Sequence, residues 1–158
     1  MKLAVAAPLV WAVFTAVPCL ADGPASPDAG VHWAAGSSTA MAITGDITLS
    51  PSQVQFQNGA ALRIQYVADV PGFTPSGDPT TALPAQLFRL TDGANPSLLQ
   101  GNTLCGPQPP TYLISQTRTL AGQPWLDLML LLGDAPPDPA SYATRLCATF
   151  GYVPADGG

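Results

Sequence analysis

The side chains that usually carry acid–base or nucleophilic chemistry are scarce in this chain. All ten acidic residues are aspartate, and the only histidine is His32. A Ser-His-Asp triad needs a buried histidine held between a serine and an acid, whereas His32 lies in a segment rich in Gly, Ala, Ser, Pro and Asp. The G-x-S-x-G motif that exposes a nucleophilic serine is also absent from the sequence. We therefore predict no catalytic residue, and we expect His32 to lie at the surface.

Two aspartates stand out because they interrupt apolar stretches. Asp46 and Asp127 each fall within a run that is predicted to be a strand. A buried carboxylate needs an ion pair or hydrogen bonds, and arginine is its natural partner. We expect a structural Asp–Arg pair, with Arg63 or Arg89 as the partner. The alternative is an aspartate-dependent hydrolase, in which paired carboxylates would support glycoside cleavage.

Metal-binding patterns and cofactor motifs are missing from the sequence. One histidine, and two cysteines that we expect to be bridged, do not supply the usual zinc ligand sets. The aspartates are spread singly, and the densest pair, Asp134 and Asp138, lacks the spacing of a calcium loop. The glycine-containing segment 101–106 lacks the lysine of a phosphate-binding loop. We predict no metal and no cofactor.

The first 21 residues have the pattern of an export signal. Lys2 supplies a positive charge, residues 3–17 form an apolar run, and Cys19 and Ala21 are the small residues before a cleavage site. We predict cleavage near Ala21 and a mature protein in the periplasm or outside the cell. One alternative is a retained membrane anchor, since the segment is near the lower length limit for spanning a bilayer; another is a lipoprotein acylated on Cys19. No transmembrane segment is expected in the mature chain.

Cys105 and Cys147 remain after removal of the signal, and we predict a disulfide between them. An isolated cysteine pair in an oxidising compartment most often forms a structural bridge. The C-x-x-C spacing of reactive thiol pairs is absent. Closing a loop of about 40 residues corresponds to roughly 4 kcal/mol of stabilisation in the chain-entropy description. The bridge would also remove both thiols from catalysis.

The charge inventory restricts the kinds of partner. The whole chain has a net charge of −5, and without Lys2 its only side chains of fixed positive charge are four arginines. Nucleic acids and anionic membranes are bound chiefly through lysine and arginine, so we expect neither as a partner. Glutamate is absent and lysine occurs only at residue 2. Because both are strong helix formers, we also expect few long helices.

Alternating apolar and polar residues predict the elements that must position these side chains. Residues 22–40 are expected to be a flexible lead and residues 41–154 a single β domain. Asn58-Gly59 lies between two alternating runs and predicts a hairpin with a type I′ turn, in which both central residues have positive φ. The pattern indicates an all-β fold, a single antiparallel sandwich or small barrel of about seven or eight strands with one disulfide. The expected strands are 41–50, 53–57, 62–66, 85–91, 97–100, 111–120, 125–132 and 142–152.

Two proline-rich loops, 70–84 and 133–141, are candidates for binding a partner. The first is unusually long for a connection without regular structure, and the second combines proline with aspartate. The aromatic residues outside the predicted strands are expected to be exposed anchors. The candidate binding residues are two aromatic residues and two loop aspartates: Trp33, Phe73, Asp134 and Asp138.

In size, export signal, strand pattern and single bridge, the chain resembles small periplasmic inhibitor and ligand-binding barrels, such as lysozyme-inhibitor-like domains. It carries no specific motif of such a family. The resemblance implies a non-enzymatic module that binds a protein or small molecule in the cell envelope. Two alternatives stay open: the aspartate-dependent hydrolase, and a structural or assembly component of the envelope. The latter would need a free sheet edge or a large exposed apolar patch.

Overall fold

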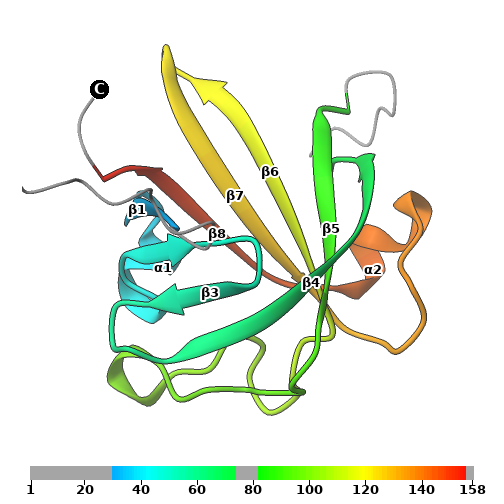
Figure 1. The fold of residues 1–158 in the computed structure, drawn as a ribbon, viewed down its shortest axis with the longest axis horizontal. Helices are drawn as coiled ribbons and strands as arrows, with labels where there is room; N and C mark the ends of the chain where they lie inside the picture. The colour runs from blue at the N-terminus through cyan, green and yellow to red at the C-terminus, as the bar shows by residue number, and fades with distance from the viewer. Residues whose placement is uncertain (1–29, 74–81, 156–158) are drawn as a thin grey trace, which may run out of the picture.

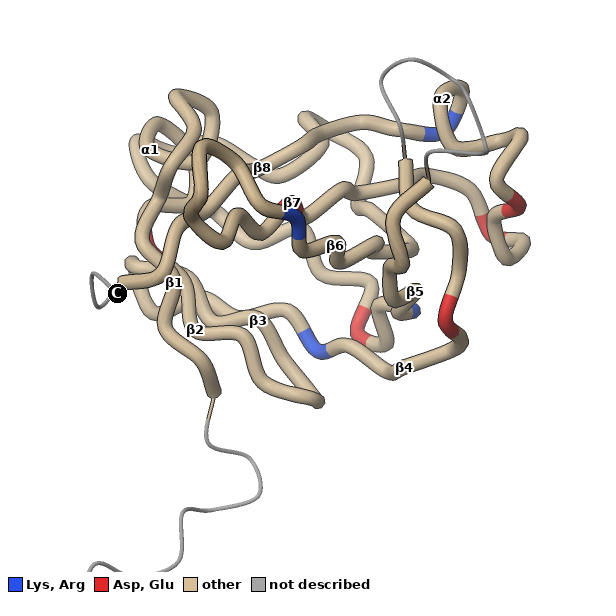
Figure 2. The backbone as a smooth tube through the Cα atoms, turned by 90° about the horizontal axis from the view of Figure 1, so that it is seen from above, with Lys and Arg blue, Asp and Glu red and all other residues tan. Residues whose placement is uncertain are grey.

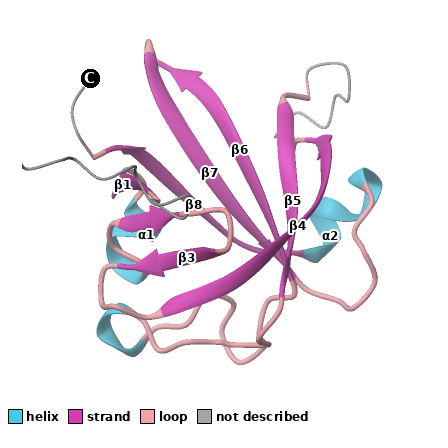
Figure 3. Cartoon of the chain, in the orientation of Figure 1, coloured by secondary structure: helices cyan, strands magenta, loops and turns pink. Residues whose placement is uncertain are grey.

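The protein folds as a closed antiparallel β-barrel, seen in a computed structural model that describes residues 30–73 and 82–155. The eight strands follow one another in chain order, and the first pairs with the last (Figure 1). This confirms the predicted all-β fold and identifies it as a barrel. The strands are β1 (Val31–Ala35), β2 (Ile47–Leu49), β3 (Gln53–Phe56), β4 (Ala61–Pro71), β5 (Pro84–Leu90), β6 (Tyr112–Leu120), β7 (Gln123–Leu131) and β8 (Leu146–Pro154). Short helical elements lie at the periphery (Figure 3): α1 (Ser38–Ile43), η2 (Leu99–Gly101), η3 (Pro139–Ser141) and α2 (Tyr142–Arg145).

The segment 30–40, predicted as part of a flexible lead, instead contains the strand that closes the barrel. β1 pairs with β2 through Trp33 and Ile47, and with β8 through Ala35 and Tyr152. The prediction was wrong because local composition does not reveal a ladder formed with the opposite end of the chain. The predicted export signal, residues 1–21, and residues 22–29 of the predicted lead lie outside the described residues.

Helix α1 occupies the place where the sequence pattern predicts the start of a strand. The hydroxyl oxygen of Ser37 accepts a hydrogen bond from the amide of Ala40 at 3.1 Å and so caps the helix. Ala40 is completely buried, and Ile43, one turn later, packs against the same core. Ala40 and Ile43 are three residues apart, a spacing that places both on one face of a helix. The alternation of a strand is clear only in the residues that follow, Ile47 and Leu49. The strand prediction is therefore correct only from Ile47 onward.

The barrel interior is a packed apolar core. Alternation along β7 directs Leu126, Leu128 and Leu130 inward, opposite Tyr152, Phe150 and Ala148 of β8. A void of about 10 Å³ within it is lined only by apolar side chains and the Tyr152 ring, and is close to the size of a single water. Helix α1 and the loop 91–111 close one end of this core, which we call the closed end. The buried interior residues are Ala40, Ile47, Val54, Phe56, Leu62, Ile64, Phe88, Leu90, Leu98, Leu104, Leu113, Leu126, Leu128, Leu130, Phe150 and Tyr152.

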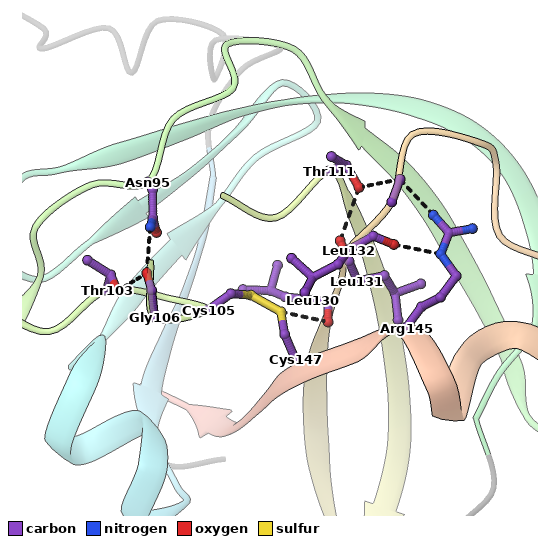
Figure 4. The surroundings of a disulfide bond; sticks show 11 residues. Asn95, Thr103, Cys105, Gly106, Thr111, Leu130, Leu131, Leu132, Arg145 and Cys147 are labelled. Carbon is purple, nitrogen blue, oxygen red and sulfur yellow. Dashed lines mark hydrogen bonds between the residues drawn. A yellow bond between two sulfur atoms is a disulfide. The ribbon is translucent and has the colours of Figure 1, made fainter. Parts of the chain in front are cut away.

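Two links secure the closed end. The hydroxyl of Tyr152 lies 2.8 Å from Oγ1 of Thr44, which itself donates to the carbonyl oxygen of Ala40 at 3.1 Å. Burial raises the pKa of Tyr152 well above its ordinary value, and the bond with Thr44 opposes this only in part. The second link is the predicted disulfide, which is confirmed: Cys105 and Cys147 are joined with their Cα atoms 5.4 Å apart. The bridge ties the loop 91–111 to β8 beside the carbonyl of Leu130 (Figure 4).

A second apolar group, the outer-face cluster, lies on the outside of β5, β6 and β7. It explains why the run 125–132 is apolar on both faces: one face lines the barrel interior and the other lies in this cluster. Tyr142 of α2 is buried in it, and Val70 and Phe73 pack against it from the end of β4. Its buried members are Ala85, Leu87, Tyr112, Ile114, Met129, Leu131 and Tyr142.

The elements around α2 and η2 also differ from the predicted strands. The run 142–152 becomes a strand only at Leu146, because a capping box between Asp138 and Ser141 starts a helical turn before it. The predicted short strand 97–100 is instead part of the turn η2. Gln100 there has a φ of 57°, a left-handed conformation that a strand cannot contain.

The hairpin predicted at Asn58-Gly59 is confirmed, but with a different turn. Only Gly59 has positive φ (86°), and its amide donates to the carbonyl oxygen of Phe56. This is a type I turn followed by a left-handed glycine, a common three-residue hairpin loop. The two-residue turn with positive φ at both positions occurs between β6 and β7, at Ala121 (51°) and Gly122 (82°).

Candidate functional site

The barrel opens at the end opposite the disulfide because two hairpins separate there. Pairing between β5 and β6 stops at Ala85 and Gln116. Pairing of β4 with β5 continues to Pro71 and Pro84, and that of β6 with β7 continues to Leu120 and Gln123. The two pairs therefore diverge toward the top of Figure 1. The gap between them is hollowed into a depression of about 460 Å³, which we call the mouth cup.

A β-bulge in β4 brings two functional side chains to the same face. Tyr66 pairs with Phe88, but the next pair is Ala68 with Leu87, so Val67 is an extra residue in β4. Residues three apart would otherwise face opposite sides of a strand. The bulge turns Asp69 to the same face as Tyr66, where it lies opposite Gln86.

The mouth cup is lined mainly by polar side chains from three strands. Alternation places Gln86 on the inward face of β5, two residues before the core residue Phe88, and Ser115 on the inward face of β6, two residues after Leu113. Gln86 and Ser115 are direct cross-strand partners. The residues that line the cup are Asp69, Pro84, Ala85, Gln86, Ser115 and Thr117.

Tyr66 lies on the same face of β4 as Asp69. Among the described residues, Asp69 is the only one with a carboxylate that lines the cup. The Tyr66 ring meets the Phe88 ring edge-to-face, with centroids 6.0 Å apart, and remains 49% exposed. Desolvation raises the pKa of Tyr66 above its ordinary value, and the neighbouring negative Asp69 carboxylate raises it further.

The charges of the described residues leave Asp69 without an arginine partner. Their only ion pair joins Arg118 Nε to Asp127 Oδ2 at 2.7 Å. Cationic positions are few and scattered along the chain trace (Figure 2). The mouth cup is therefore an acidic depression lined by side chains that can form hydrogen bonds.

The aromatic residues predicted as exposed anchors are half-buried instead. Trp33 packs against the barrel interior from β1, and Phe73 packs against the outer-face cluster. The expected full exposure was wrong because Trp33 lies in β1, which forms in a segment whose composition suggested a flexible lead, and Phe73 packs against the outer-face cluster two residues after β4 ends. Asp134 and Asp138 are exposed on the loop between β7 and η3. The Asp138 carboxylate caps η3, and Asp134 contributes its carbonyl oxygen to the Tyr112 hydroxyl at 3.2 Å.

Asp127 forms the predicted structural ion pair, but with a different arginine. Its carboxylate accepts hydrogen bonds from Arg118 Nε and from the Trp125 indole, both at 2.7 Å. The indole lies flat across β8, where a Cβ on Gly151 would overlap it. Asp46 is exposed and accepts from the Ala35 amide at 2.9 Å. Each carboxylate thus has a structural role.

His32 lies at the surface, as expected. Its Nδ1 is 2.9 Å from the Thr48 hydroxyl, at the edge of a second depression of about 220 Å³ on the outside of β1, β2 and β3. Asp46, Gln55 and Gln57 line the same depression. Ser37, the nearby serine that a triad would need, caps α1 instead. The histidine therefore has no serine–acid arrangement around it among the described residues.

The part of the chain described here contains no group of three or more His, Cys, Asp or Glu side chains that could hold a metal ion. None of its helices is long and apolar enough to cross a membrane.

The sequence contained a partial signal for the mouth cup. Gln86 interrupts the alternating set that continues with Phe88 and Leu90, and Ser115 and Thr117 interrupt the set that begins at Leu113. Polar residues at one end of an otherwise apolar strand face mark the end of a core. The bulge at Val67, which turns Asp69 toward them, has no such signal.

Comparisons with known proteins identify no relative: no protein-family profile, no curated protein and no solved structure matches this chain.

Proposed function

We propose that this protein is a non-enzymatic binding module that holds a small molecule in the mouth cup. The observation that carries the proposal is a depression of about 460 Å³ lined by Asp69, Gln86, Ser115 and Thr117 on paired strands. This volume is within the range of small-molecule sites, about 300–1,000 Å³. Polar groups fixed on strands also keep their geometry better than groups on loops.

The packed barrel interior limits the ligand to the open end. A void of about 10 Å³ cannot admit a ligand group, so the bound molecule would stay among the residues that line the mouth cup rather than enter the barrel. A protein partner remains an alternative occupant of the rim, through the exposed Val67, Leu83 and Leu120.

The two alternative functions have less support. Glycoside cleavage uses two carboxylates, and Asp69 is the only one lining the cup among the described residues. An assembly component would use a free sheet edge or a large exposed apolar patch. The barrel is closed and each strand has two neighbours, so the unpaired edges among the described residues are limited to the mouth, where β4 beyond Arg63 and β6 beyond Gln116 pair on one side only.

We also propose that the protein works outside the cytoplasm. The Cys105–Cys147 disulfide is compatible with an oxidising compartment, and the export signal predicted for residues 1–21 would direct it there. Mass analysis of the protein recovered from cell fractions tests this proposal. A mature chain starting near Asp22 outside the cytoplasm supports it, and a full-length cytoplasmic chain contradicts it.

Ligand-detected NMR with a library of small molecules tests the binding function. The wild type is compared with Thr117→Trp, which fills the cup with an indole from an exposed position, and with Thr149→Trp, an exposed position on the outer side of β8. We expect a group of compounds that bind the wild type and Thr149→Trp but not Thr117→Trp. If no compound distinguishes the two variants, the mouth cup is not the binding site.

A further inference from the structure

Every polar side chain that lines the mouth cup can accept hydrogen bonds. The Asp69 carboxylate that lines the cup can only accept hydrogen bonds, and the bulge places the Tyr66 hydroxyl on the same face of β4. The hydroxyls of Ser115 and Thr117 and the amide of Gln86 can each accept or donate. A ligand that fits this set supplies several N–H or O–H donors.

The charge in the cup is negative, and the arginines of the chain do not neutralise it. Arg63 and Arg89 alternate with the inward-facing residues of β4 and β5 and therefore lie on the outside of the barrel. Arg118 is paired with Asp127. Arg145 donates to the carbonyl oxygens of residues 132 and 133 at the other end of β7.

The half-exposed Tyr66 ring adds a second element suited to a cation. An aromatic face attracts ammonium and guanidinium groups with roughly 0.5–2 kcal/mol, depending on how far the cation is desolvated. Tyr66 and Asp69 reach the same face only because of the bulge at Val67. A carboxylate beside an aromatic ring in an otherwise uncharged, acceptor-rich depression favours an organic cation over a neutral polyol or an anion.

On this basis, and resting on the proposed binding function, we propose that the mouth cup recognises a small organic cation. Its ammonium or guanidinium group would form an ion pair with Asp69 and contact the Tyr66 ring, while Gln86, Ser115 and Thr117 would accept its remaining N–H groups or bind its polar substituents.

The test uses benzylamine, butylguanidine and choline as cations, benzyl alcohol and glucose as neutral probes, and benzoate as an anion. Titrations followed by backbone amide NMR of the folded protein report binding at residues 86, 115 and 117. We expect cations to bind at least tenfold more tightly than benzyl alcohol or benzoate, and to weaken as salt is added. Equal or tighter binding of the neutral probes or of benzoate at these residues overturns the proposal but leaves the binding function intact.

Two matched variants locate the charge. Asp69→Asn keeps the shape of the side chain and is expected to reduce cation affinity at least tenfold, with less than a twofold change for benzyl alcohol. Asp134→Asn removes an exposed carboxylate beyond the closed end of β7 and is expected to leave both affinities unchanged. An equal loss in the two variants would assign the effect to net charge and contradict a site at Asp69. The absence of shifts at the cup with every probe, together with a library that does not distinguish Thr117→Trp, would contradict the binding function itself.

Discussion

The two ends of this barrel are built from the same strands but from different kinds of side chain. At the closed end, α1 and the loop 91–111 place apolar side chains over the core, and a disulfide and a buried Tyr152–Thr44 hydrogen bond fasten them. At the mouth, β5 and β6 separate and their inward faces carry Gln86, Ser115 and Thr117. The links between distant segments of the chain therefore lie at the closed end, whereas the mouth carries polar side chains.

Removal of the disulfide is expected to have the largest effect on stability, and it tests whether the closed end and the mouth are independent. Replacing Cys105 and Cys147 together with serine should lower the free energy of unfolding by about 4 kcal/mol, because the unfolded chain regains the freedom of a long loop. Urea unfolding of oxidised wild type and the double variant measures the difference. Probe binding at the mouth should persist wherever the variant is folded, and its loss in the folded variant would contradict the separation of the two ends.

Alkaline pH should weaken the closed end through Tyr152. Its pKa is raised in the folded state, so the unfolded chain loses this proton first as pH rises above the ordinary value of 10.0. The stability that depends on the neutral hydroxyl is therefore fully present below pH 10 and declines above it, by about 1.4 kcal/mol at pH 11 from this residue.

Unfolding of wild type and Tyr152→Phe at pH 8 and pH 11 measures this dependence. The phenylalanine variant should lose less stability between the two pH values, although it lacks the bond to Thr44 at both. An alkaline loss of stability that is the same in wild type and Tyr152→Phe would contradict the prediction.

At the tip of the β6–β7 hairpin, Ala121→Gly should stabilise the protein. Ala121 has a φ of 51°, a left-handed conformation that is costly for a residue with a Cβ. We expect a gain of roughly 0.5–1 kcal/mol in the free energy of unfolding, after the greater flexibility of glycine in the unfolded chain is included. Ala61→Gly, in β4 without positive φ, should instead destabilise. Thermal unfolding of both variants checks the opposite signs.

The smallest expected effect is that of Gln86→Leu on stability. Gln86 is exposed in the mouth cup, so its loss should change the free energy of unfolding by no more than about 0.5 kcal/mol. Leu128→Ala in the interior should cost about 2–5 kcal/mol. Urea unfolding compares the two. A cost for Gln86→Leu that approaches that of Leu128→Ala would show that the mouth is part of the core and not a separate binding region.

Local patterns predicted most of the strands because their periodicity reflects burial. The runs around Phe56, Leu62, Phe88, Leu113 and Leu128 all alternate, and each forms a strand with the expected inward face. The cysteine pair was predictable because, with Cys19 assigned to the predicted export signal, the two remaining cysteines allow a single pairing. In contrast, β1 and the cap of α1 depend on contacts with Gly151 and Tyr152 at the other end of the chain, which no local window contains.

The candidate site was less predictable than the fold. The predicted anchors Trp33 and Phe73 are aromatic, and aromatic residues beside a core are usually drawn into it, as both are here. The residues of the mouth cup are ordinary polar side chains whose significance comes from where β5 and β6 separate. Asp69 belongs with them only through a bulge, which inserts one residue without any distinctive sequence.

The seam between β1 and β8 has a consequence for the order in which the barrel is made. Three residue pairs join the strands, from Trp33–Pro154 to Ala35–Tyr152. A chain that emerges from its N-terminus, from a ribosome or through a membrane pore, presents β1 first and its partner β8 last. The sheet from β1 to β7 can assemble in sequence, but the outer edges of β1 and β7 stay unpaired until β8 is free. Barrel closure is therefore a step that must wait for the last strand.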